Sequence, residues 1–123
     1  MSKKKVLIVE DYPATSEMIA SILQGEGIIT LTATDGPSAL EKARAEKPDL
    51  ILLDIMMPEM SGFEVAEKLK ADPKTAKIPI FFVSVRATDE NVKKGKDLGA
   101  AEYVTKPFDP FSLMEMIKKQ LGS

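Results

Sequence analysis

Four short strand-like runs of this sequence lead into side chains that can take part in catalysis or bind an ion. The residues at these exits are Glu10 and Asp11, Asp54, Ser84, and Lys106. Carboxylates gathered in one crevice repel each other by roughly a few kcal/mol per close pair at an effective dielectric constant of about 20. A hard cation such as Mg²⁺, together with Lys106, would hold them. A carboxylate nucleophile, a metal, a lysine and a hydroxyl group together suit phosphoryl transfer.

Each of these residues also has an ordinary structural interpretation when it is taken alone. Glu10 and Asp11 could form a turn before a helix, and Asp54 could be a helix N-cap. Ser84 could bond to the backbone at a strand end, and Lys106 could be a solvated loop lysine. The occurrence of such residues at four strand exits of one sheet favours a shared site.

The composition restricts which chemistry is available. The chain has 123 residues, no cysteine and no histidine, which excludes disulfides, thiolate zinc sites and cysteine catalysis. The formal net charge of -2 gives no reason to expect direct binding to nucleic acid. No apolar segment reaches membrane length and no export signal is visible, so we expect a cytoplasmic domain without membrane contact.

Strand-like and helix-like segments alternate from one end of the chain to the other. The strand patterns are 6–9, 28–33, 50–53, 80–83 and 103–104. The helical patterns lie within 13–25, 35–47, 61–72, 88–99 and 109–121. This alternation predicts a three-layer α/β fold, in which helices cover both faces of a doubly wound parallel sheet. In the last helix, the apolar stripe expected to dock on the sheet comprises Phe111, Leu113, Met114, Ile117 and Leu121.

Over its full length the sequence resembles the receiver domain of two-component response regulators, a family that includes chemotaxis regulators. The matching residues are Glu10-Asp11, the motif from Asp54 to Gly62, Ser84, Tyr103 and the triplet Lys106-Pro107-Phe108. The resemblance implies a flavodoxin-like (βα)5 fold with strand order 2-1-3-4-5. It also implies that residues 1–123 form a single receiver domain without an output domain.

The resemblance further implies a role for each site residue. Asp54 would accept a phosphoryl group from a partner histidine kinase or histidine phosphotransfer protein, because this chain has no histidine of its own. The ligands of Mg²⁺, or of Mn²⁺ in its place, would be Glu10, Asp11, Asp54 and the backbone carbonyl of Met56. Ser84 and Lys106 would bind the phosphoryl oxygens, and the Lys106-Pro107 bond is expected to be cis. Such a domain assists its own phosphorylation and dephosphorylation and is not an enzyme in the usual sense.

Signalling would use the same contacts. If Ser84 moves towards the phosphoryl group, Tyr103 can swing inward and alter the face made by the fourth helix, fifth strand and fifth helix. That face would bind a downstream protein, and the domain would be a monomer or a phosphorylation-dependent dimer. Met56 and Arg86 would flank the pocket, and we hypothesise that Met56 shields the acyl phosphate from water. Glu10 and Ser84 depart from the Asp and Thr that are commoner in the family.

Three other functions fit parts of the pattern. A magnesium-dependent phosphatase of the haloacid dehalogenase type also uses a strand-end aspartate, but needs a second aspartate where Met56 stands. A flavodoxin-like nucleotide carrier needs a phosphate-binding loop after the first strand, where Glu10 and Asp11 would repel phosphate. A receiver that acts as a scaffold without phosphorylation would not need the whole acidic, hydroxyl and lysine set.

Overall fold

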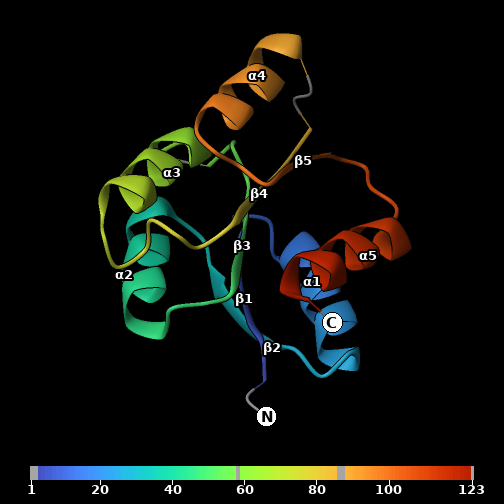
Figure 1. The fold of residues 1–123 in the computed structure, drawn as a ribbon. Helices are drawn as coiled ribbons and strands as arrows, with labels where there is room; N and C mark the ends of the chain where they lie inside the picture. The colour runs from blue at the N-terminus through green and yellow to red at the C-terminus, as the bar shows by residue number, and fades with distance from the viewer. Residues whose placement is uncertain (1–2, 58, 86–87, 123) are drawn as a thin grey trace.

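The computed structural model describes residues 3–57, 59–85 and 88–122, and its centre is a parallel sheet. The strands are β1 (Lys5–Val9), β2 (Ile29–Ala33), β3 (Leu50–Leu53), β4 (Ile80–Ser84) and β5 (Glu102–Thr105). Their order is β2-β1-β3-β4-β5, and every neighbouring pair is parallel. The predicted fold class and strand order are therefore confirmed, and the threonine-containing strand β2 lies at an edge of the sheet (Figure 1).

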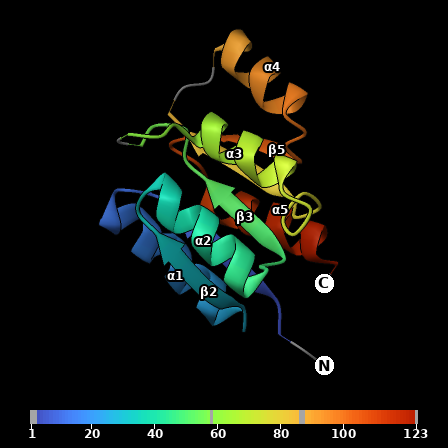
Figure 2. The same ribbon diagram turned by 90° about the vertical axis from the view of Figure 1, so that its left-hand side faces the viewer.

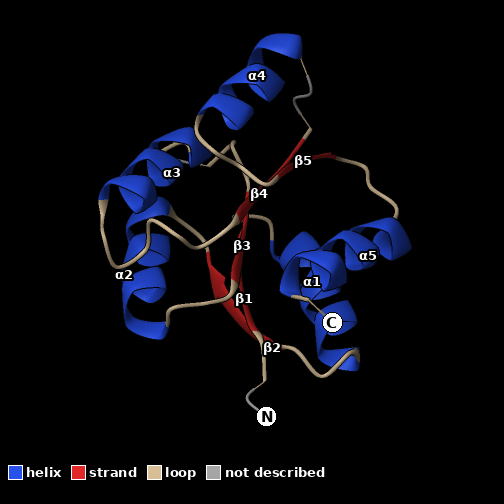
Figure 3. Ribbon diagram, in the orientation of Figure 1, coloured by secondary structure: helices blue, strands red, loops and turns tan. Residues whose placement is uncertain are grey.

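Helices cover both faces of this sheet. The helices are α1 (Pro13–Gly25), α2 (Gly36–Glu46), α3 (Gly62–Ala71), α4 (Asp89–Asp97) and α5 (Pro110–Leu121). Helices α1 and α5 lie side by side on one face, and α2 and α3 cover the other (Figures 1 and 3). The view in Figure 2 shows that α4 lies beyond α3, towards the β5 end of the molecule. Among the described residues, none of the helices is both long and apolar enough to cross a bilayer.

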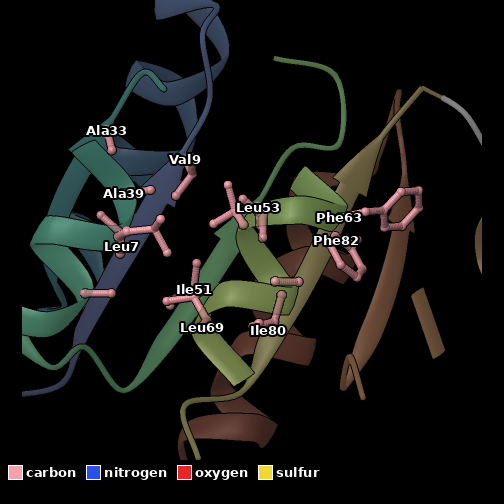
Figure 4. Packing of buried hydrophobic residues seen from close by; sticks show 14 of the residues in the cluster. Leu7, Val9, Ala33, Ala39, Ile51, Leu53, Phe63, Leu69, Ile80 and Phe82 are labelled. Atoms are coloured by element: carbon pink, nitrogen blue, oxygen red, sulfur yellow. The ribbon is translucent and has the colours of Figure 1, made fainter. Parts of the chain in front are cut away.

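The sheet is buried on both faces because successive side chains of a strand point to opposite sides. Facing α2 and α3 are Leu7, Val9, Ile51, Leu53, Ile80 and Phe82 (Figure 4). Facing α1 and α5 are Val6, Ile8, Leu50, Leu52, Phe81 and Val83. Continuous apolar runs are therefore required in β1, β3 and β4, and every residue of β3 is buried. These immobile strands fix the positions at which the polar residues leave the sheet.

Side-chain caps begin four of the helices. Asp35 accepts a hydrogen bond from the Ser38 N–H (2.8 Å), and Asp109 accepts one from the Phe111 N–H (3.3 Å). The predicted caps Ser61 and Thr88 are confirmed, since they accept bonds from the N–H groups of Glu64 and Asn91. Such caps satisfy backbone donors that a helix leaves free at its start.

The predicted apolar stripe of α5 is wrong at one position. Phe111 is 81% exposed, whereas Leu113, Met114, Ile117 and Leu121 are buried. At about 100° per residue, the four buried side chains share one side of the helix, and Phe111 lies roughly a third of a turn from its centre. The angular position of Phe111 in the first turn of α5 places it outside the buried stripe, although the residue is apolar.

The connection from β3 to α3 folds back tightly onto Asp54. The Gly62 N–H donates to the Ile55 carbonyl at 2.9 Å. A Cβ atom on Gly62 would lie 2.2 Å from the Asp54 carbonyl oxygen and 2.8 Å from the Ile55 Cα. Only glycine fits at this first position of α3, so the helix start is held against the backbone of the strand exit.

Replacing Gly62 by alanine should destabilise the protein because the added methyl group meets backbone atoms that cannot move aside. We expect Gly62→Ala to lower the free energy of unfolding by about 2 kcal/mol, measured by urea denaturation.

The matched control is Gly25→Ala, at the end of α1, where a Cβ would meet nothing within 4 Å. This change should be neutral or stabilise the protein by about 0.5 kcal/mol, because alanine loses less backbone entropy in a helix. Equal effects of the two substitutions would contradict the close approach at Gly62.

Candidate functional site

The carboxyl ends of β1, β3 and β5 bring the candidate residues to one edge of the sheet. The backbone ladder continues past the strand ends: the Asp54 N–H donates to the Val9 carbonyl (3.0 Å), and the Lys106 N–H donates to the Ser84 carbonyl (2.8 Å). The Glu10 N–H likewise donates to the Ala33 carbonyl of β2. Residues far apart in the chain are therefore held in fixed relative positions before their side chains interact.

The Lys106 ammonium group joins two acids from different strands. Its Nζ lies 2.5 Å from Glu10 Oε1 and 3.3 Å from Asp54 Oδ2. Both acids are buried, with 3% of Glu10 and 7% of Asp54 exposed. A cation in this position offsets part of the repulsion between two carboxylates that have little access to water.

Asp11 completes a cluster of three carboxyl groups. It is exposed, and one oxygen from each of Glu10, Asp11 and Asp54 lies within 4.8 Å of the others. Among the described residues, the buried Glu10 Oε2 atom has no hydrogen-bond donor. A buried polar atom without a partner costs about 1–3 kcal/mol, so this oxygen is suited to a cation. Oxygen ligands of this kind fit Mg²⁺ or Mn²⁺, and the residues present therefore fit a divalent metal.

The electrostatics of the pair follow from burial and from the charges in contact. The pKa of Glu10 is raised to about 7: burial is the largest cause, the neighbouring Asp54 carboxyl group adds to it, and Lys106 acts in the opposite direction. For Lys106, burial alone would lower the pKa, but the hydrogen bond with Glu10 and the charge of Asp54 outweigh it, so the pKa is raised. Lys106 therefore stays charged while Glu10 titrates near neutral pH.

The Asp54 side chain is also held from its own loop, because the Met56 N–H donates to Asp54 Oδ1 at 3.0 Å. The Met56 side chain is 45% exposed. The Lys106-Pro107 peptide bond is cis. Pro58, within the motif from Asp54 to Gly62, and Arg86 lie outside the described residues.

Ser84 and Tyr103 lie on the two neighbouring strands β4 and β5. Ser84 is fully buried and shares a side-chain hydrogen bond with Tyr103, whose side chain is half-buried. Burial raises the pKa of Tyr103, its hydrogen bond with Ser84 opposes this, and the charge of Asp54 adds to it. Behind Tyr103, the ring of Phe82 lies 6.2 Å away between centroids, and Phe63 lies 5.2 Å beyond Phe82.

The structure thus brings Glu10, Asp11, Asp54 and Lys106 together, with the Met56 backbone bonded to Asp54. Ser84 and Tyr103 form an adjacent pair. The sequence patterns did not indicate Thr15, which lines the small pocket shared by Glu10, Asp54 and Lys106. Thr15 lies in the first turn of α1 with no distinguishing spacing, so only the packing of the helix reveals it.

A family model described as the response regulator receiver domain matches residues 6–118. The chain belongs to this family. It is therefore a receiver domain of the two-component type, which decides against the phosphatase and nucleotide-carrier alternatives. The motif from Asp54 to Gly62 and the Lys106-Pro107-Phe108 triplet, which carried the resemblance, both lie within the matched range.

Individual relatives agree with this assignment. The chain is 40% identical to the phosphate regulon transcriptional regulatory protein PhoB of Pseudomonas aeruginosa, over 98% of this chain and 53% of that protein. It is 37% identical to the DNA-binding response regulator MtrA of Mycolicibacterium smegmatis, over 97% of this chain and 51% of that protein. The chain thus spans about half the length of these curated relatives.

A solved structure supports the fold over nearly the whole chain. The chemotaxis protein CheY4 of Vibrio cholerae superposes with a TM-score of 0.90 at 32% identity, covering 96% of this chain and 98% of that one. The flavodoxin-like chemotaxis-regulator fold is thereby confirmed.

Replacing Glu10 by glutamine should change how the stability of the metal-free protein depends on pH. Between pH of about 4.5 and about 7, the folded protein keeps a proton on Glu10 that the unfolded chain has released. The free energy of unfolding should therefore fall as the pH rises through this window, by roughly 1–3 kcal/mol in total. Glu10→Gln cannot titrate and should lack this fall, as measured by urea denaturation with a chelator present.

The control for this experiment is Asp97→Asn, which changes an exposed aspartate of α4 outside the cluster. It should keep the pH dependence of the parent. A Glu10→Gln variant with the same profile as the parent would show that the buried acid does not titrate near neutral pH.

Proposed function

We propose that Asp54 is the phosphoacceptor of this receiver domain and takes its phosphoryl group from a histidine of a partner kinase or histidine phosphotransfer protein. The supporting observation is the placement of Asp54, which is buried between the Lys106 ammonium group and the Met56 N–H. A carboxylate held in this way loses little further freedom on reaching the reacting geometry. These 123 residues contain no histidine, so the donor histidine lies outside them.

A divalent metal belongs to this proposal. Glu10, Asp11, Asp54 and the backbone carbonyl of Met56 would hold Mg²⁺, with Mn²⁺ as an alternative. When bound, the ion supplies positive charge that stabilises the equatorial oxygens of the transferring phosphoryl group. The carboxylate cluster and the unpartnered Glu10 Oε2 support this ligand set.

The protein's own groups account for the remaining chemistry. A carboxylate oxygen of Asp54 forms a bond to phosphorus while the bond from phosphorus to the donor nitrogen breaks, and the freed imidazole leaves with the electron pair. Lys106 already contacts Asp54 and can exchange that contact for a phosphoryl oxygen. The Ser84 hydroxyl would bind a second phosphoryl oxygen, which requires it to turn away from Tyr103. The domain in this way assists its own phosphorylation and dephosphorylation.

The Ser84–Tyr103 hydrogen bond offers a route from the site to the protein surface. When Ser84 turns to the phosphoryl group, Tyr103 loses this hydrogen bond and can adopt a new position. Helix α4 would respond, because its buried residue Gly95 lies against Tyr103 and Phe82: a Cβ there would be 3.1 Å and 3.0 Å from their ring carbons. We propose that the face formed by α4, β5 and α5 binds a downstream protein or a second copy of the domain.

Incubation of the protein with Mg²⁺ and acetyl phosphate should add one phosphoryl group, because the domain itself supplies the catalytic groups. Intact mass spectrometry should detect this addition in the parent and in the control Asp97→Asn, which alters an exposed aspartate of α4. Asp54→Asn, or chelation of the metal, should abolish it.

Two results would contradict the proposal. A phosphorylated Asp54→Asn variant would place the acceptor elsewhere. A parent that binds Mg²⁺ yet never becomes phosphorylated, by the small donor or by any kinase extract, would favour the scaffold function.

Replacing Met56 by asparagine should shorten the lifetime of the phosphorylated protein several-fold. The Met56 side chain is partly exposed beside Asp54 and would keep water from the acyl phosphate, whereas a polar amide would bind water there. The backbone N–H that holds Asp54 is retained in this variant. The measurement is the half-life of the phosphoprotein after removal of the donor, with Met56→Leu as the control that keeps the parent's half-life. An unchanged half-life in Met56→Asn would disprove the shielding role.

A further inference from the structure

The loop from Asp54 to Ser61 joins β3 to α3 and carries the proposed phosphoacceptor at its start. It is longer than the roughly 2–6 residues usual in such connections. Within it, Glu59 has a φ of 68°, a left-handed conformation that costs about 1 kcal/mol or more outside glycine. A long connection with an unfavourable backbone conformation keeps its shape only where surrounding contacts hold it.

Two contacts hold this loop, one against the backbone of the β3 exit and one against helix α2. At the end next to Asp54 and α3, Gly62 lies against the Asp54 and Ile55 backbone. On the side of α2, the Met60 side chain lies directly across Gly36: a Cβ on Gly36 would be 2.6 Å from Met60 Sδ, 2.9 Å from its Cβ and 3.0 Å from its Cγ. Three atoms of one side chain therefore occupy the space that any other residue at position 36 would need.

The surface that receives Met60 is itself rigid. Gly36 is the buried first residue of α2, and the cap of this helix is fixed by the bond from the Ser38 N–H to Asp35. Met60 also packs against the core cluster that includes Ala39 and Phe63. Because the start of α2 is buried and capped, its contact with Met60 limits the positions that Met60 can take. The same contact therefore limits the positions of the loop.

We propose that Met60 is a positioning residue for phosphoryl transfer, which acts on Asp54 through the loop and rests on the proposed function of Asp54. Through its contact with Gly36, Met60 keeps the Met56 backbone beside the Asp54 carboxylate, where the Met56 N–H donates to Asp54 Oδ1. Gly62 is fixed against the Asp54 and Ile55 backbone, so a displacement of Met60 changes the course of the chain back towards Met56. Misplacement of a reacting group by about 1 Å can reduce a rate by about a hundredfold.

A double-mutant cycle at positions 36 and 60 tests this proposal. The four proteins are the parent, Gly36→Ala, Met60→Ala and the double variant. Two quantities are measured on each: the Mg²⁺ dissociation constant by calorimetry, and the rate constant for phosphorylation by acetyl phosphate at saturating Mg²⁺ and donor. Each single substitution should lower the rate constant about tenfold and weaken Mg²⁺ binding. The double variant should be no worse than Met60→Ala, because the added methyl group then has no long side chain to displace.

Two control variants separate positioning from packing. Met60→Leu keeps the volume and should retain the parent's rate constant and Mg²⁺ affinity. Ile78→Ala removes a side chain that packs on the same core cluster from the connection before β4. It should lower the free energy of unfolding while leaving both measured quantities unchanged.

Two outcomes would overturn the proposal. Met60→Ala and Gly36→Ala could lower stability as Ile78→Ala does and leave the rate constant and Mg²⁺ affinity unchanged, which would make Met60 a packing residue only. The two effects could instead multiply in the double variant, which would show that they do not act through their mutual contact. If the parent itself takes no phosphoryl group, the proposed function of Asp54 fails, and the Mg²⁺ affinities across the cycle still decide whether Met60 positions the loop.

Discussion

The arrangement of the site depends on the ion pairs that the Lys106 ammonium group makes with two carboxylates. The ammonium group contacts two buried carboxylates, Glu10 after β1 and Asp54 after β3, from its own place after β5. Without a cation between them, two acids with so little exposure to water would repel each other or take up protons. The strand order β2-β1-β3-β4-β5 makes the contact possible, because it places the carboxyl ends of β1 and β3 side by side. Since all strands are parallel, β5 ends on the same side of the molecule.

This arrangement still leaves one oxygen of Glu10 unpartnered among the described residues, with Asp11 nearby at the surface. A single lysine therefore does not neutralise the cluster. Burial is the main cause of the raised pKa of Glu10, and it makes a missing positive charge costly, so the cluster suits a divalent cation. Two close contacts also hold the site: Gly62 lies against the Asp54 and Ile55 backbone, and Gly36 lies against the Met60 side chain. They fix the loop after Asp54 without adding further charge, so that the carboxylate is held by shape as well as by electrostatics.

The fold was predictable because its signals are local and strong. Continuous apolar runs in β1, β3 and β4 require a sheet buried on both faces, and the predicted caps at Ser61 and Thr88 mark helix starts. The gathering of acids and Lys106 at one edge followed from parallel topology alone. What the sequence could not provide depends on packing between elements. Three features arise from contacts between distant segments: the different burial of Glu10 and Asp11, the contact of Met60 with Gly36, and the Ser84–Tyr103 bond. The exposure of Phe111 depends on its angular position around α5.

The central claim is that one divalent cation and Lys106 together hold three carboxylates at the sheet edge. A crystal structure of the protein grown with Mn²⁺, with a map of its anomalous scattering, tests this claim most directly. We predict a single manganese peak between the carboxyl groups of Glu10, Asp11 and Asp54, beside the Met56 backbone. No peak there, with Glu10 and Asp54 still paired to Lys106 at a saturating metal concentration, would contradict it.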